Sequence, residues 1–105
     1  MGNLDFKALK KRSKAIRESY HKLEKEYHQT QWSVEEDALA FLTDAGLVGR
    51  NVMSQQERWP KTNSQEELEH KLGECIWWLS ILADRSGIDI EEATEKFLSK
   101  TEKIF

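Results

Sequence analysis

Two charged side chains interrupt the most apolar stretch of the chain and are the residues best placed to do chemistry. Lys71 and Glu74 lie three residues apart in residues 68–85, a segment that is apolar on nearly every face from position 75 to 83. A spacing of three places both side chains on one face of an α-helix. Because a charge at the edge of a core is expensive to desolvate, it needs a partner of opposite charge or a ligand. The sequence therefore predicts an ion pair or a binding site on this helix face.

Four helices with short connections are expected to position these residues. Apolar residues recur at steps of three and four in residues 5–28, 33–53, 64–86 and 89–104, and strand-like alternation is absent. Pro60 ends helical structure in the loop 54–63, and Gly87 suits a left-handed C-terminal cap. The predicted capping boxes are Ser33 with Glu36, Ser64 with Glu67, and Asp89 with Glu92. The fold class is therefore all-α, a four-helix bundle.

The first two helices carry apolar rows, and the narrow row of the first is expected to pack along one neighbour, within the chain or across a dimer. Gly46 and Gly49 lie in the second row, and each lowers helix propensity by about 1 kcal/mol relative to Ala. Such glycines are tolerated where a neighbouring helix or a ligand packs close to the backbone. The first row is Phe6, Leu9, Ser13, Ile16, Tyr20, Leu23 and Tyr27, and the second is Leu39, Leu42, Ala45, Gly46, Gly49, Val52 and Met53. The inner face expected for the fourth helix is Ile90, Ala93, Phe97, Leu98, Thr101 and Ile104.

Length and composition predict one domain, residues 1–105, with a net charge of −3. Residues 1–31 carry eight Lys or Arg and four Asp or Glu, whereas residues 32–105 carry eight and fifteen. This balance argues against a nucleic-acid polymer as partner. The single cysteine, Cys75, lies on an apolar stripe and is expected to be a small buried hydrophobe. Neither a signal peptide nor an apolar run long enough for a membrane is evident, so a soluble, cytoplasmic protein is expected.

Residues 74–92 resemble the second half of the MazG-like nucleoside triphosphate pyrophosphohydrolases. They read ECIWWLSILADRSGIDIEE, against a family pattern of approximately E-L-x-D, an apolar stretch, L-A-D, a short G-I-D link and an acidic helix start. Residues 39–53 resemble the family's E-x-x-E helix, and residues 12–24 resemble the first helix of a short MazG-like group. The resemblance covers most of the chain and implies a homodimer or a dimer of dimers, with active sites near the subunit interfaces.

The resemblance also implies a chemistry and the positions that would perform it. Family members cleave NTPs or dNTPs into a nucleoside monophosphate and pyrophosphate, using Mg²⁺ held by E-x-x-E on one helix and E-x-x-D on the next. The matching positions here are Asp44 and Leu47, then Lys71 and Glu74. Asp44 and Glu74 are thus the expected catalytic metal ligands, whereas Leu47 has no lone pair and the ammonium of Lys71 repels a cation. The four positions sum to about −1 instead of −4, so weak or absent Mg²⁺ binding and impaired hydrolysis are expected.

Two other arrangements of the same residues remain open. In one, Glu67, His70 and Glu74, spaced i, i+3 and i+7, join Asp44 in a one-metal site, although imidazole suits Zn²⁺ or Mn²⁺ better than Mg²⁺. His70 is otherwise a surface or interface histidine. In the other, Lys71 pairs with Asp44 or Glu74 and replaces the metal by an internal salt bridge.

Two further groups could contact a nucleotide. Lys96, Lys100 and Lys103 form a cationic stripe where the resemblance implies phosphate contacts, or they simply complement the dipole of the last helix. Trp32 and Trp59 flank the second helix and could stack on a base, or pack in the core or a dimer.

Three functions follow from these observations. The first is a MazG-like hydrolase with a degraded metal site, acting on a nucleoside triphosphate. The second is a non-catalytic relative that binds a nucleotide or a protein. The third is a helical module unrelated to nucleotides.

Overall fold

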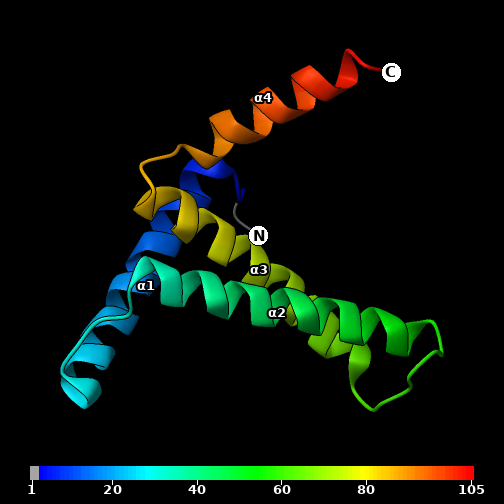
Figure 1. Ribbon diagram of the computed structural model, residues 1–105, viewed down its shortest axis with the longest axis horizontal. Helices are drawn as coiled ribbons and strands as arrows, with labels where there is room; N and C mark the ends of the chain where they lie inside the picture. The colour runs from blue at the N-terminus through cyan, green and yellow to red at the C-terminus, as the bar shows by residue number, and fades with distance from the viewer. Residues whose placement is uncertain (1–2) are drawn as a thin grey trace. The chain divides into compact units, whose positions relative to one another are not determined.

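The structure is a computed structural model that describes residues 3–105, and it confirms the all-α class (Figure 1). Within that range there are four helices and no strand. The helices are α1 (Phe6–His28), α2 (Val34–Gln55), α3 (Ser64–Arg85) and α4 (Ile90–Glu102).

Three helix starts follow the sequence closely. Asp5 caps α1 by accepting a hydrogen bond from the backbone N–H of Ala8 at 2.8 Å. The predicted capping box of α2 is present: the N–H of Glu36 donates to Ser33 Oγ at 3.2 Å, and the N–H of Ser33 donates to Glu36 Oε1 at 2.8 Å. Asp89 caps α4 through its side chain, in which Oδ1 accepts hydrogen bonds from the backbone N–H groups of Glu91 and Glu92 at 2.9 and 3.1 Å. Side-chain oxygens thus satisfy N–H groups that a helix leaves without partners.

The box predicted at Ser64 and Glu67 is replaced by other contacts. Ser64 is the first residue of α3 rather than its cap, and its hydroxyl accepts a hydrogen bond from Gln55 Nε2 at 2.6 Å. The Glu67 carboxylate binds Lys61 Nζ at 2.6 Å. Gln55 of the preceding helix and Lys61 of the loop therefore bind the hydroxyl and the carboxylate that a capping box would use.

The end of α3 has the geometry that its glycine predicts. Gly87 has φ of +69°, the N–H of Ile88 donates to the carbonyl of Ala83 at 2.8 Å, and the N–H of Gly87 donates to that of Asp84 at 3.2 Å. This pair of bonds is a Schellman motif, which needs a residue in the left-handed region.

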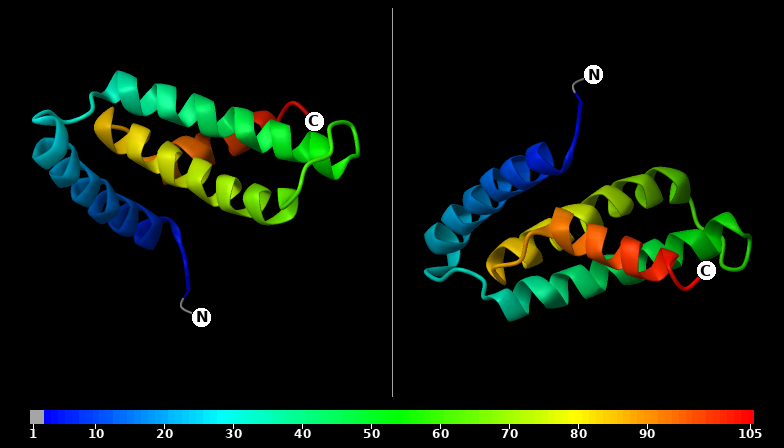
Figure 2. Two further views of the ribbon diagram at one scale, coloured as in Figure 1. Left: turned by 90° about the horizontal axis from the view of Figure 1, so that it is seen from below. Right: turned by 90° about the horizontal axis from the view of Figure 1, so that it is seen from above.

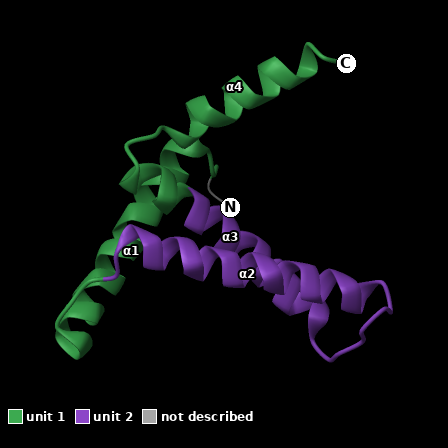
Figure 3. Ribbon diagram, viewed as in Figure 1, with its two compact units in different colours: residues 1–31, 80–105 green, residues 32–79 purple. Residues whose placement is uncertain are grey.

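The chain divides into two compact units (Figure 3). Unit 2 is Trp32–Leu79, and unit 1 combines the residues up to Gln31 with Ser80–Phe105. In unit 2, α2 and the first part of α3 run side by side in opposite directions, joined by the loop at residues 56–63 (Figures 1 and 2). Unit 1 holds α1, the end of α3 and α4.

The buried face of α2 is polar, and most of its apolar row is exposed. The buried residues of this helix are Asp37, Asp44, Asn51 and Ser54. Leu39, Leu42, Val52 and Met53 are all exposed. Sequence periodicity identifies an apolar row but not what covers it, and here the opposite side of the helix is the one buried within the chain.

The predicted rows of α1 and α4 are only partly covered within the described residues: Phe6, Leu9, Ile90, Ala93 and Thr101 are half-buried, and Ser13 is buried. The buried residues of α1 are Ser13 and Arg17, and of its predicted apolar row Ile16, Tyr20, Leu23 and Tyr27 are exposed. No residue of α4 is fully buried, so its expected inner face is at most half-covered. Among residues 3–105 the buried apolar residues are Trp78, Ile81 and Ala83.

Candidate functional site

Lys71 forms an ion pair with two carboxylates inside unit 2. Its Nζ lies 3.0 Å from Asp44 Oδ1 on α2 and 2.8 Å from Glu74 Oε1 one turn along α3. All three side chains are largely shielded from solvent. The salt-bridge arrangement left open by the sequence is therefore present, and it uses both acids rather than one.

Trp78 completes this cluster. Its indole Nε1–H donates to the second oxygen of Asp44, Oδ2, at 2.8 Å, and the contact is buried. Trp78 lies seven residues after Lys71, two helical turns on the same face, and that spacing is the signal that could have identified it. We call Asp44, Lys71, Glu74 and Trp78 the Lys71 cluster.

The hydrogen bonds from Lys71 to Glu74 and Asp44 raise the pKa of the lysine above its ordinary value, and they outweigh the opposing effect of burial. The ammonium is therefore charged at every physiological pH. With two carboxylates and one ammonium, the cluster carries a net charge of −1. One oxygen of Asp44 and one of Glu74 already contact the ammonium, and the other Asp44 oxygen accepts from Trp78. This donor set does not suit Mg²⁺, which needs several free oxygen ligands.

Leu47, the second position of the first motif, is half-buried and adds no ligand. Its carbonyl accepts a hydrogen bond from Asn51 Nδ2 at 2.8 Å. Asn51 and Asp37 are completely buried, and with Asp44 they are spaced by seven residues along α2. The sequence analysis missed this polar line, although a repeat of seven puts its members on one helix face.

The residues of the alternative one-metal site are engaged elsewhere. The hydrogen bond from Lys61, with a smaller contribution from Asn51, holds the pKa of the Glu67 carboxyl below its ordinary value. The side chain of His70 is 75 % exposed, and its Nε2 lies 3.8 Å from Glu74 Oε1. In the part of the chain that the structure describes, no group of three or more His, Cys, Asp or Glu side chains could hold a metal ion. A one-metal site would require Lys61 and Lys71 to leave their carboxylates.

Cys75 is half-buried next to the cluster. Burial raises the pKa of its thiol, and the charges of Asp44 and Glu74 raise it further. The thiol is thus protonated at neutral pH and is a poor nucleophile, which agrees with the role of a small apolar residue.

The lysines of α4 belong to unit 1 and are exposed. Lys96 Nζ pairs with Glu92 Oε1 at 3.0 Å, and Lys103 is the residue that follows the last turn of the helix. Both are ordinary positions for lysine on a solvated helix end, and phosphate contacts by Lys96, Lys100 and Lys103 stay a prediction.

One face of Trp59 is occupied. The guanidinium carbon of Arg50 lies 3.5 Å from the centre of its ring, and Arg50 Nη1 donates to the carbonyl of Trp59 at 2.7 Å. This cation–π contact fixes the loop after α2 and leaves at most the other face for stacking. Trp32 is also partly exposed.

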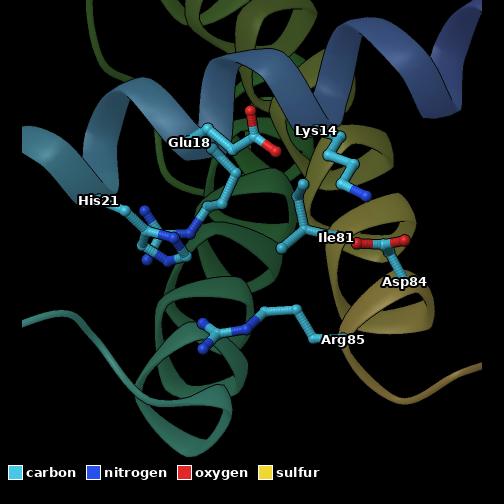
Figure 4. A pocket seen from close by; sticks show the side chains of 7 residues that line it. Lys14, Glu18, His21, Ile81, Asp84 and Arg85 are labelled. Atoms are coloured by element: carbon cyan, nitrogen blue, oxygen red, sulfur yellow. The ribbon is translucent and has the colours of Figure 1, made fainter.

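Unit 1 contains a cavity of about 200 Å³ between α1 and the end of α3 (Figure 4). Arg17, buried in its wall, also pairs with Glu24 Oε2 at 2.9 Å. Side chains of both charge signs line the cavity, and the sequence analysis did not single it out. They are Lys14, Arg17, Glu18, His21, Ile81, Asp84 and Arg85.

Comparison with protein-family models, with curated proteins and with solved structures found no match to this chain. None of the helices between residues 3 and 105 combines the length and the apolar character needed to cross a membrane.

Proposed function

We propose that this chain is a MazG-like helical protein that has lost metal-dependent pyrophosphohydrolysis and serves in the cytoplasm as a non-catalytic, homodimeric binding module. The observation that carries the proposal is the position of Lys71, whose ammonium lies within 3.0 Å of both remaining acids of the family's metal-binding pattern. The ammonium neutralises a charge where the family would hold Mg²⁺.

Coulomb energies support this interpretation. Two unit charges about 4 Å apart interact by roughly 4 kcal/mol at an effective dielectric constant of 20, and a divalent ion doubles that value. A magnesium ion beside Lys71 would therefore meet a repulsion of several kcal/mol. The Leu47 side chain has no oxygen atom that could bind the ion and offset this repulsion. Without metal ions to bridge the phosphates, the attacking water and the leaving pyrophosphate lose their main electrostatic stabilisation.

A first experiment measures pyrophosphate release from a panel of NTPs and dNTPs with Mg²⁺ or Mn²⁺. We expect no turnover above the protein-free control. Hydrolysis at ordinary enzyme rates, about 1 s⁻¹ or more, would overturn the proposal.

A second experiment restores the missing ligands. The double variant Leu47→Glu with Lys71→Glu should bind Mg²⁺ detectably by calorimetry. The matched control, Leu47→Gln with Lys71→Gln, removes the hydrocarbon and the ammonium without adding acids and should bind less tightly. Equal Mg²⁺ affinity in the two variants would show that these four positions do not correspond to the family's metal ligands.

Of the two binding roles, protein interaction is better supported than nucleotide binding. Arg50 covers one face of Trp59, and Lys96 is paired with Glu92. Exposed large apolar side chains, by contrast, occur on all four helices. Calorimetry with a non-hydrolysable dNTP analogue should accordingly detect no binding at submillimolar concentrations.

A further inference from the structure

We propose that a second copy of this chain covers the outer side of α2, in an antiparallel, two-fold symmetric pairing centred on Gly46 and Gly49. This inference rests on the homodimer of the proposed function and not on the loss of hydrolysis. We call Leu39, Leu42, Gly46, Gly49 and Met53 the α2 outer row.

The exposed side of α2 lacks charge over four turns. Leu39 and Leu42 are 65 % and 66 % exposed, and Met53 is 45 % exposed. This span has two charged residues. Asp44 is buried, and Arg50 is held against the ring of Trp59. A helix face turned to water normally carries charged residues, so this one is suited to an apolar partner. The exposed residues between positions 38 and 53 are Ala38, Leu39, Leu42, Thr43, Gly46, Gly49, Val52 and Met53.

The described part of the chain gives no packing reason for the two glycines of the row. A Cβ atom built on Gly46 or Gly49 meets no other described atom within 4 Å, and neither residue has a positive φ. Glycine in mid-helix lowers helix stability relative to alanine. Close approach of a helix from outside the chain gives a reason for both residues.

The order of residues in the row favours a second copy over an unrelated protein. From Leu42 to Met53 the row reads large, small, small, large, and it reads the same in reverse. The antiparallel register that places Leu42 opposite Met53 of a partner therefore also places Gly46 opposite Gly49, and Thr43 opposite Val52. A two-fold interface requires such self-complementarity, because each surface must match its own copy.

The α2 outer row is long enough to contact a second helix over several turns. The row spans fourteen residue steps, about 21 Å along the helix axis. In the same unit, Leu72, Ile76 and Leu79 of α3 are also exposed. A stable complex buries roughly 800 Å² per partner, so a dimer interface of that size would have to extend beyond the α2 outer row.

Light scattering coupled to size exclusion, with sedimentation velocity, measures the mass of the intact chain. The wild type should be a dimer, and Leu42→Glu should raise its dissociation constant at least about thirty-fold. Phe97→Glu is the matched control, because Phe97 is equally exposed at 65 % but lies on α4. Gly46→Leu separates folding from assembly: circular dichroism should show an unchanged helix content while the dimer is lost.

Cross-linking tests the register. In a Cys75→Ser background, Gly46→Cys combined with Gly49→Cys should give a disulfide-linked dimer under mild oxidation, while Thr94→Cys with Lys100→Cys on α4 should not.

A monomeric wild type would overturn both the homodimer and this interface and would mean that a different protein covers α2. A dimer unaffected by Leu42→Glu and Gly46→Leu would overturn this interface alone. Pyrophosphate release bears on neither result.

Discussion

At the scale of single residues, Lys71 decides what the cluster can do. Replacing it by methionine keeps an unbranched side chain one atom shorter than lysine but leaves Asp44 and Glu74 without a cation between them. Because the lysine is partly exposed, we expect Lys71→Met to lower the free energy of unfolding by about 2 kcal/mol, below the range for fully buried pairs. Urea denaturation measures this change, and Lys100→Met, on the exposed face of α4, is the control.

Lys71→Met also tests whether the ammonium is what keeps a divalent ion out of the cluster. Once the ammonium is gone, the two acids can attract a divalent ion, so millimolar Mg²⁺ should restore part of the stability of Lys71→Met and have no such effect on the wild type. A Lys71→Met variant as stable as the wild type, with no response to Mg²⁺, would mean that the ion pair contributes nothing.

Asp89 provides a pH-dependent prediction. Hydrogen bonding from the backbone N–H of Glu92, and then from Lys10 Nζ at 3.1 Å, holds the pKa of its carboxyl below 3.8. Stability from this group is present above pH 3.8 and is lost as the pH falls through the lower, folded-state pKa. Carbon NMR should find the titration midpoint below 3.8. Lys10→Ala should move it part of the way back up, whereas Lys11→Ala should leave it in place.

At the scale of elements, the caps of α2 and α4 were predictable from local sequence, whereas the contacts at the start of α3 and the faces that the helices bury were not. Ser33, Glu36 and Asp89 act on backbone groups within three residues, so their roles follow from local sequence. The orientation of α2 depends on contacts made far along the chain, such as that between Asp44 and Lys71, 27 residues apart. Apolar periodicity cannot supply that information: it identifies the row of α2, but not that the opposite side of the helix is the one buried within the chain.

The turn after α2 makes a prediction of its own. Glu57 has φ of +61°, and the bonds from Glu57 N to the Ser54 carbonyl and from Arg58 N to the Met53 carbonyl form a Schellman motif. A left-handed conformation strains any residue with a Cβ. Glu57→Gly should therefore raise the free energy of unfolding by about 0.5–1 kcal/mol. Gln56→Gly, at φ of −91°, should lower it instead.

At the scale of the whole molecule, the sequence predicted the ion pair of the Lys71 cluster but not its completion by Trp78 or the scarcity of buried apolar residues. Trp78, Ile81 and Ala83 are the buried apolar residues of the described range, residues 3–105. Small domains depend on apolar burial for most of their stability. A chain with so few buried apolar residues is therefore expected to gain much of its stability from association.

That expectation can be measured without knowing the interface. If folding and dimerisation are coupled, the thermal midpoint must rise with protein concentration, because mass action favours the dimer. A tenfold increase in protein concentration stabilises the folded dimer by about 1.4 kcal/mol. For a dimer of two chains of this length, that should raise the thermal midpoint by roughly 3–6 °C. Calorimetry between 10 and 1,000 µM should show this rise for the wild type and for Phe97→Glu, but not for Leu42→Glu. A midpoint independent of concentration in all three proteins would mean that each chain is stable alone, and that its exposed apolar rows contribute nothing to folding.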